Sequence, residues 1–214
     1  MNKRCIFRAS ILAVCFVLCS GNLCAENIDP YEDGSQYAYG ANIGWLNFEP
    51  NVPSDPCDYG VTVSDTELIG FIWAENIGWI NLSPSTYGGV INDGYGNLSG
   101  YAWGENVGWI NFDPNVPGDD TDYGVTIDWQ GNFDGWAWGE NIGWIHFQSA
   151  SPVAYKVQAC KVNFEDFANF ALYWLDTGAG LPADLDSLGD VDIDDLRVLA
   201  IHWLSFCPDG WQLK

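Results

Sequence analysis

The chain has 214 residues, of which 29 are acidic and 7 are basic, so its formal net charge is −22. No Lys or Arg occurs between Glu26 and Tyr155. A field of this sign repels nucleic acids and anionic membranes and attracts cations, so we exclude nucleic-acid binding.

The first 25 residues have the three parts of a secretory signal peptide. Basic residues precede an apolar run from 9 to 19, and small and polar residues follow up to Ala25. The apolar run is too short to span a bilayer, and no other segment reaches about 18 apolar residues. We therefore expect cleavage after Ala25 and a secreted protein, extracellular or at the cell surface, that does not insert into the membrane.

One motif occurs in four copies. Its clearest copy is GYAWGENVGWINF from Gly100, and the other copies begin at Gln36, Gly70 and Gly135. The copies follow one another at intervals of about 30 to 35 residues, which is a spacing typical of repeat architectures. We expect a short N-terminal segment over residues 26–35 and then a repeat domain over residues 36–150.

Each copy has the pattern of a β-hairpin. A run of strand-forming residues from 100 to 103 is followed by a turn through 104–106 and a second run from 108 to 112, and Asn and Gly tolerate the positive φ of such turns. Third strands are expected from Tyr59 and Tyr123. The sequence thus predicts a mainly β domain of antiparallel meanders with about ten to twelve strands, and it leaves open a barrel, a sandwich or a propeller-like array.

Alternation along the strands gives each repeat two faces. Ile110 and Phe112 share one face and should be buried, whereas Trp109 and Asn111 share the other. Because the aromatic rings recur in every copy, cross-strand packing is the favoured interpretation of the second face. The alternative is a row of rings that stacks on sugars. The residues concerned are Trp73, Trp79, Trp103, Trp109, Trp138 and Trp144.

The sequence offers no constellation for catalysis. Glu75, Glu105 and Glu140 occupy equivalent turn positions, and carboxylates repeated in this way are typical of solvated turns rather than of a glycosidase acid/base pair. The two histidines, His146 and His202, have no serine or cysteine partner in a recognisable pattern. We therefore expect no enzymatic activity.

The composition becomes helical after an expected linker over residues 151–159. Apolar residues at three- and four-residue spacing predict two short amphipathic helices that pack on each other within a unit over residues 160–207, followed by a tail over residues 208–214. The expected buried faces consist of Phe164, Phe167, Ala171, Trp174 and Leu175 in the first helix and of Leu196, Leu199, Ala200, Trp203 and Leu204 in the second.

Between these helices, DLDSLGDVDIDD fits the twelve-residue calcium loop of an EF-hand, with Gly189 at the sixth position, where the sharp turn lies. Leu188 stands where a further oxygen ligand is expected, so we predict weak Ca²⁺ binding. The alternative is an acidic cap on the second helix, with Asp192 as its N-cap. The expected ligands are Asp184, Asp186, the carbonyl of Asp190, Asp192 directly or through water, and Asp195.

An Asp at the twelfth position before a helix that ends in Trp-Leu resembles the dockerin family. VNFEDFANFALYWL from Val162 matches VDIDDLRVLAIHWL from Val191, as the two loop-helix halves of dockerins match each other. The first half lacks the ligands, so one Ca²⁺ site is expected. The resemblance implies that Phe164, Glu165, Ile193 and Asp194 contact a cohesin-like or other surface or scaffold protein.

Three of the seven cysteines remain after the expected cleavage, namely Cys57, Cys160 and Cys207. Cys160 and Cys207 bracket the helical unit, so we favour a disulfide between them in an oxidising compartment, with Cys57 free or intermolecular. The alternative is three unpaired thiols.

The four motif copies are similar to GYAW-ENIGWI-type repeats in large exported bacterial proteins of unknown function. With the dockerin resemblance, they predict a secreted non-catalytic protein whose dockerin-like module attaches a β-repeat module to a scaffold or cell surface. The alternative is a carbohydrate-binding or polysaccharide-degradation-associated protein that uses the Trp-rich face, because dockerins usually belong to polysaccharide-degrading machinery.

Overall fold

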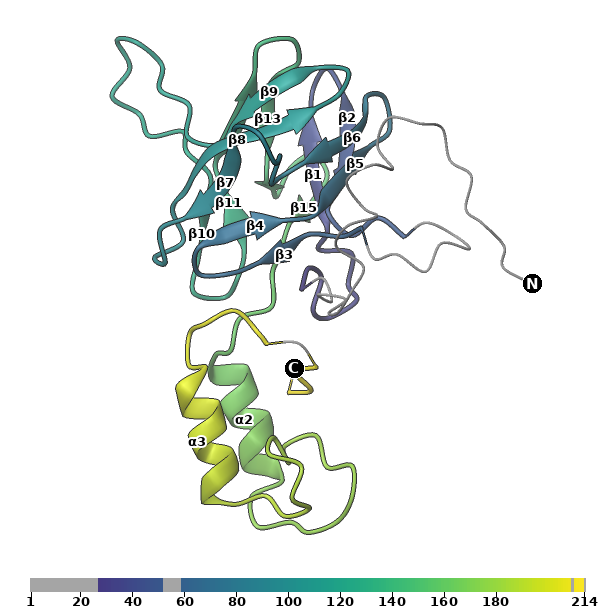
Figure 1. The fold of residues 1–214 in the computed structure, drawn as a ribbon, viewed down its shortest axis with the longest axis vertical. Helices are drawn as coiled ribbons and strands as arrows, with labels where there is room; N and C mark the ends of the chain where they lie inside the picture. Colours follow the sequence, from purple (N-terminus) through teal and green to yellow (C-terminus); the bar gives the residue numbers. More distant parts are fainter. Residues whose placement is uncertain (1–26, 52–58, 209, 214) are drawn as a thin grey trace, which may run out of the picture.

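The computed structural model describes residues 27–51, 59–208 and 210–213. The expected signal peptide and Cys57 lie outside the described residues. Figure 1 shows a β body that contains the four repeats and, at one end of it, a small unit with two helices side by side. The mainly β fold with a two-helix unit is therefore confirmed.

The four motif copies form the four hairpins. Their strands are β1 (Tyr37–Gly40) with β2 (Gly44–Asn47), β5 (Phe71–Ala74) with β6 (Gly78–Asn81), β8 (Leu98–Gly104) with β9 (Gly108–Asn111), and β12 (Trp136–Gly139) with β13 (Gly143–His146). The other strands are β3 (Thr62–Val63), β4 (Glu67–Ile69), β7 (Gly89–Asn92), β10 (Thr126–Ile127), β11 (Phe133–Asp134), β14 (Gln148–Ser149) and β15 (Tyr155–Lys156). The helices are α2 (Phe164–Leu172) and α3 (Ile193–Ile201).

The hairpins close into an antiparallel barrel. Strand β2 pairs with β5, β6 with β8, β9 with β12, and β13 with β1, so the last hairpin returns to the first. The register is the same where neighbouring hairpins pair. Asn81 lies opposite Trp103 between β6 and β8, and Asn111 lies opposite Trp138 between β9 and β12. Closure removes the exposed sheet edges that an open array of hairpins would have. Of the arrangements left open by the sequence, the barrel is the one adopted.

The two faces of the strands are as the alternation predicts. Ile110 and Phe112 are buried inside the barrel, whereas Trp109 is exposed on its outer surface. The residues that follow the four hairpins are all buried: Phe48, Leu82, Phe112 and Phe147. The ring centroid of Phe147 lies 5.7 Å from the centroids of both Phe48 and Phe112. Each hairpin thus contributes one apolar residue to a shared core layer, which none could form alone.

A closed circuit of side-chain hydrogen bonds joins the four turns. In each turn the asparagine amide donates to a backbone carbonyl in the preceding hairpin's turn, at 2.9 to 3.0 Å. Because the acceptor is a main-chain carbonyl at a strand end, each bond satisfies a group that the ladder leaves unpaired. This role explains the asparagine common to all copies. The donor and acceptor pairs are Asn42 to Ile142, Asn76 to Ile43, Asn106 to Ile77, and Asn141 to Val107.

Segments outside the motif copies complete the barrel. Val157 and Ala159, expected in a linker, are fully buried in the barrel core, and Ala159 forms an antiparallel bridge with Ile28 from the expected N-terminal segment. The Val157 amide donates to the Phe147 carbonyl (3.2 Å), as a third strand does in the other repeats. The β body therefore extends beyond residue 150, up to Cys160, because the fourth repeat also needs its third strand.

The helical unit corrects the expected face of the first helix. Phe170 is buried, whereas all five residues expected on the buried face are exposed: Phe164, Phe167, Ala171, Trp174 and Leu175. The orientation follows from Asp166, which is buried and occupies the same side of α2 as Phe170, four residues later. In α3 the face is closer to the expectation, since Leu199 is buried, although Ala200 and Leu204 are exposed.

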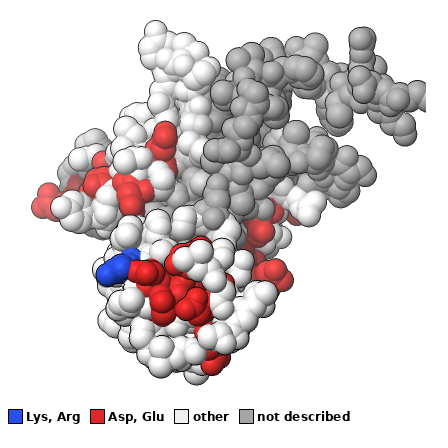
Figure 2. Space-filling view, turned by 60° about the horizontal axis from the view of Figure 1, so that its bottom comes forward, with Lys and Arg blue, Asp and Glu red and all other residues white. Residues whose placement is uncertain are grey.

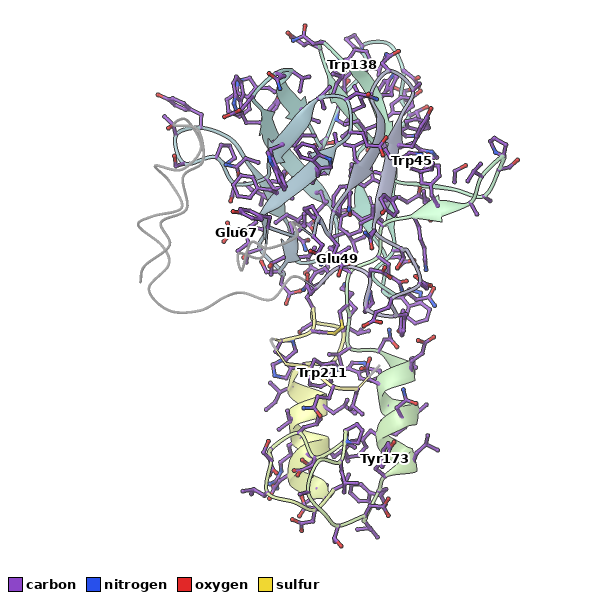
Figure 3. All side chains as sticks on the ribbon, turned by 90° about the vertical axis from the view of Figure 1, so that its right-hand side faces the viewer. Trp45, Glu49, Glu67, Trp138, Tyr173 and Trp211 are labelled. Carbon is purple, nitrogen blue, oxygen red and sulfur yellow. A yellow bond between two sulfur atoms is a disulfide. The ribbon has the colours of Figure 1, made fainter. Side chains whose placement is uncertain are left out.

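The expected tail belongs to this small core. Leu213 is buried beside Phe170 and Leu199, and Trp211 packs against the same cluster. Figure 3 shows Trp211 and Tyr173 between the two helices. Two helices of nine residues bury too little alone, so the returning tail supplies part of the missing apolar surface.

Candidate metal site

Three carboxylates converge between α2 and α3. Asp184, Asp186 and Asp195 each offer an oxygen within 4.8 Å of the others, and Asp195 is fully buried while the other two are partly exposed. Figure 2 shows acidic side chains gathered in one patch on the helical unit. Three such oxygens could hold a metal ion, and hard divalent cations such as Ca²⁺ prefer oxygen ligands of this kind.

Backbone amides fix the positions of these carboxylates. Asp184 accepts from the amides of Leu188 and Gly189, both at 3.0 Å, so its side chain closes the loop on itself. Gly189 has φ +94°, a conformation that favours glycine, which accounts for this residue at the turn. Asp195 accepts from the amides of Asp186 (3.0 Å) and Asp192 (2.8 Å), which ties the start of α3 to the loop.

The charges in the loop affect one another. The pKa of Asp186 is raised by partial desolvation and by the neighbouring carboxylates of Asp195, Asp184 and Asp192, although the Leu188 amide that donates to it lowers the value. Like charges this close disfavour full ionisation, and a bound cation would remove that conflict.

The other two expected ligands, Asp190 and Asp192, are not among the three converging carboxylates. The Asp192 side chain accepts from the Asp194 amide (2.7 Å) as the N-cap of α3, in a capping box with Asp195. Asp190 forms a backbone bridge with Thr177. Leu188, at the position that lacks a ligand, is exposed and offers the loop only its amide. The structure thus brings three of the five expected residues together.

The two halves of the unit are related by an approximate twofold repeat. The Leu175 amide donates to the Val191 carbonyl, and the Leu204 amide donates to the Val162 carbonyl, both at 2.9 Å. Asp166 occupies the place of Asp195 in the capping box of α2, but its free oxygen accepts from the indole Nε1 of Trp211 (2.7 Å). Burial raises the pKa of Asp166, and the Trp211 hydrogen bond opposes the rise.

A disulfide lies in the half of the unit that lacks the acidic loop. Cys160 and Cys207 are bonded, as the sequence analysis favours. The Cys207 amide donates to the Cys160 carbonyl (3.0 Å), which corresponds to the bond from Gly178 to Gly189 (2.8 Å) in the other half. The covalent link and the acidic loop therefore occupy equivalent places in the two halves.

The expected partner residues lie at the starts of the two helices. Phe164 and Ile193 are exposed, at 67% and 52%, and the Asp194 side chain forms an ion pair with Arg197. Glu165 is also exposed, but it accepts a hydrogen bond from Tyr31 of the β body (2.6 Å). Phe164 and Ile193 thus present apolar surface, although the Phe164 ring also packs edge-on against Trp203, with 5.0 Å between centroids. Glu165 also joins the two units.

Tryptophans pair across the second, third and fourth hairpins, and Tyr39 takes the place of the first tryptophan in the first hairpin. Their centroids are 4.7 to 4.9 Å apart in T-shaped pairs, as the packing interpretation predicts, and Trp73, Trp103 and Trp138 remain more than one third exposed. Trp45 and Trp138 are labelled on the barrel in Figure 3. The pairs are Trp73 with Trp79, Trp103 with Trp109, and Trp138 with Trp144.

The residues weighed for catalysis lie in turns, in strand β13 and at the end of α3. Glu75, Glu105 and Glu140 are exposed in the turns. His146 stacks on Trp136, with 3.9 Å between the ring centroids, and burial lowers the pKa of its imidazole while Asp134 opposes that effect. His202 lies at the C-cap of α3.

Within the described residues, no helix is both long and apolar enough to cross a membrane. No family model, curated protein or solved structure matches this chain.

Proposed function

We propose that this chain is a secreted, non-catalytic protein whose C-terminal unit binds Ca²⁺ and attaches the barrel to a scaffold or cell-surface protein. The observation that supports it most is the convergence of Asp184, Asp186 and Asp195 on a loop held by backbone amides. Apolar side chains left exposed beside the loop, such as Ile193, are the contacts that a cohesin-like partner would cover.

Calcium would act by ordering this unit. With three carboxylates and no ligand at Leu188, we expect weak binding, with a dissociation constant of about 10⁻⁴ to 10⁻³ M, which is typical of extracellular modules. Calcium at about 100-fold above that constant adds roughly 2.7 kcal/mol of stability, a large fraction of what a unit of this size has. The attachment surface would then be more stable where calcium is present.

The two halves supply a matched test. Calcium is titrated into the purified chain while amide exchange of α2 and α3 is followed, in the unaltered protein, in Asp195→Asn and in Asp166→Asn. Asp195 belongs to the acidic loop, whereas Asp166 has the same place in the half without one. We expect millimolar calcium to slow exchange in the unaltered chain and in Asp166→Asn, and to have no effect in Asp195→Asn.

If calcium slows exchange equally in both variants, or in neither of them, the loop is only an acidic cap of α3. A second experiment tests the partner. Binding of the chain to purified cohesin domains is measured with calcium and with a chelator. Ile193→Asp should abolish this binding and leave the calcium response intact. Binding that survives chelation and this substitution would contradict the attachment surface.

A second candidate function is carbohydrate binding by the barrel. It is favoured by the tryptophan pairs, whose outer rings stay partly exposed although they pack against each other. Flat apolar faces beside side-chain amides are suited to sugars, which have an apolar ring face and a rim of hydroxyl groups. Glycan affinity electrophoresis of the whole chain is the first test.

A further inference from the structure

Three of the four hairpins have a tyrosine packed on the tryptophan of their second strand. In each case the tyrosine comes from the third strand of the preceding repeat, and the preceding repeat of the first hairpin is the fourth. In each pair the tyrosine ring covers part of the tryptophan. The pairs are Tyr59 with Trp79, Tyr123 with Trp144, and Tyr155 with Trp45, with 5.2 to 5.5 Å between ring centroids.

Backbone hydrogen bonds identify the equivalent position for the third hairpin. A valine amide of the third strand donates to the carbonyl that ends the preceding hairpin: Val61 to Phe48, Val125 to Phe112 and Val157 to Phe147, and here Val90 to Leu82. The covering tyrosine lies two residues before the valine. Two residues before Val90 stands Gly88, with φ +89°.

Gly88 leaves one tryptophan uncovered. A Cβ at Gly88 would lie 2.7 Å from Cζ3 of Trp109, so the chain passes the edge of this ring without placing a side chain on it. Trp109 is 41% exposed, and its counterparts in the other hairpins are less exposed, namely Trp45, Trp79 and Trp144. The fourfold pattern is therefore broken at one place on the outer surface.

A hollow of about 830 Å³ opens at this place. Trp109 lines it together with Trp138 from the next hairpin and Tyr87, which is 77% exposed. Asn111 and Glu140 add an amide and a carboxylate. Sites for small molecules usually have about 300 to 1,000 Å³ and combine aromatic walls with a few polar groups, so the hollow has the size and composition of such a site.

We infer that this hollow binds a neutral glycan, with one pyranose ring placed on Trp109 where the other repeats place a tyrosine. This inference deepens the carbohydrate-binding candidate function and is independent of the calcium loop. A sugar ring offers an apolar face to the tryptophan and hydroxyl groups to Asn111 and Glu140. The flanking rings of Trp138 and Tyr87 would contact adjacent sugar units.

The surroundings argue against other occupants. Glu140 and the surplus of acidic residues in the barrel repel an anionic glycan. An aromatic side chain of another protein would cover Asn111 and Glu140 without giving them hydrogen-bond partners, which is costly. A quaternary ammonium group fits a narrow aromatic cage, whereas this hollow is open and wide.

The test measures binding of the full chain to defined probes by titration calorimetry. The probes are neutral hexasaccharides of β-1,4-linked glucose, xylose and mannose, with polygalacturonate as the anionic arm and choline as the cationic arm. Each is measured with calcium and with a chelator. We expect at least one neutral hexasaccharide to bind, equally in both conditions, and the other two arms to fail.

Matched variants locate the site. Trp138→Ala removes a ring from the hollow, and Trp73→Ala removes its counterpart, which has nearly the same exposure (37% and 38%) but lies outside it. Tyr87→Ala tests the rim at a position too exposed to affect folding. We expect affinity to fall at least about tenfold in Trp138→Ala, as for an aromatic hot spot that the ligand covers. Affinity should also fall in Tyr87→Ala and remain unchanged in Trp73→Ala.

The outcomes separate the hollow from carbohydrate binding in general. Equal losses in Trp138→Ala and Trp73→Ala would place sugar binding elsewhere on the barrel and overturn the inference while keeping the candidate function. Failure of all neutral sugars, or binding of choline alone, would overturn both. The calcium response of α2 and α3 is unaffected by any of these results, so it tests attachment separately.

Discussion

Replacing both cysteines of the disulfide by serine should unfold the helical unit in the absence of calcium. The link closes a loop with a sequence separation of 47 residues. Chain-entropy arithmetic for a loop of this length gives about 4 kcal/mol. Saturating calcium contributes less, roughly 2.7 kcal/mol at 100-fold excess over its dissociation constant. The buried cluster around Phe170 and Leu199 is too small to replace either contribution.

Amide exchange with mass spectrometry resolves the effect by segment. With a chelator present, the double variant should lose protection in α2 and α3 and keep the barrel's protection unchanged, because the barrel is closed by its own hairpins. Millimolar calcium should restore the protection only in part, since the smaller term cannot offset the larger one. Protection of α2 and α3 that equals that of the unaltered chain under chelation would refute this reasoning.

Three further outcomes are expected. Burial lowers the pKa of His146, so the unfolded chain takes up a proton first as pH falls below about 6.5, and the barrel should lose stability there; His146→Asn should flatten the fall of the melting temperature between pH 7 and 5, and an unchanged slope would contradict this assignment. Asn42→Ala should destabilise the barrel by about 1 to 3 kcal/mol in denaturant titration, because the Ile142 carbonyl loses its donor, whereas a change within error would mean that the circuit of amides contributes nothing. Thiol titration of the secreted, denatured, unreduced protein should find one thiol, Cys57, and three would exclude the disulfide in solution.

The strands and their faces could be predicted because the same alternation occurs four times. A pattern such as Trp109, Ile110, Asn111 and Phe112 fixes which side is apolar, and the structure buries that side. Closure could not be predicted in this way. It depends on the pairing of β13 with β1, which joins residues about 100 positions apart, and strand period alone carries no information on such distant partners.

The face of the first helix shows where apolar periodicity is insufficient. Phe164, Phe167 and Ala171 have helical spacing, yet they lie outside because Asp166 turns inward to accept from Trp211. A capping carboxylate with a distant indole donor outweighs a short apolar stripe, and nothing in the local pattern of α2 indicates that donor. The acidic loop could be predicted better, since its carboxylates and its glycine lie within one short segment.

The repeats also indicate how to search this barrel for function. A residue present at all four places, such as the turn asparagine, is explained by closure, so it carries no separate evidence of a ligand. Comparison of sequence letters would align Tyr87-Gly88 with Tyr59-Gly60 and conclude that the covering tyrosine is present in every repeat. The hydrogen bond of Val90 shifts that alignment by one residue and places Gly88 opposite Trp109. Because a tyrosine packs on the tryptophan at the other three places, its absence at this one costs the fold a contact. Binding of a ligand ring is a function that can account for that cost.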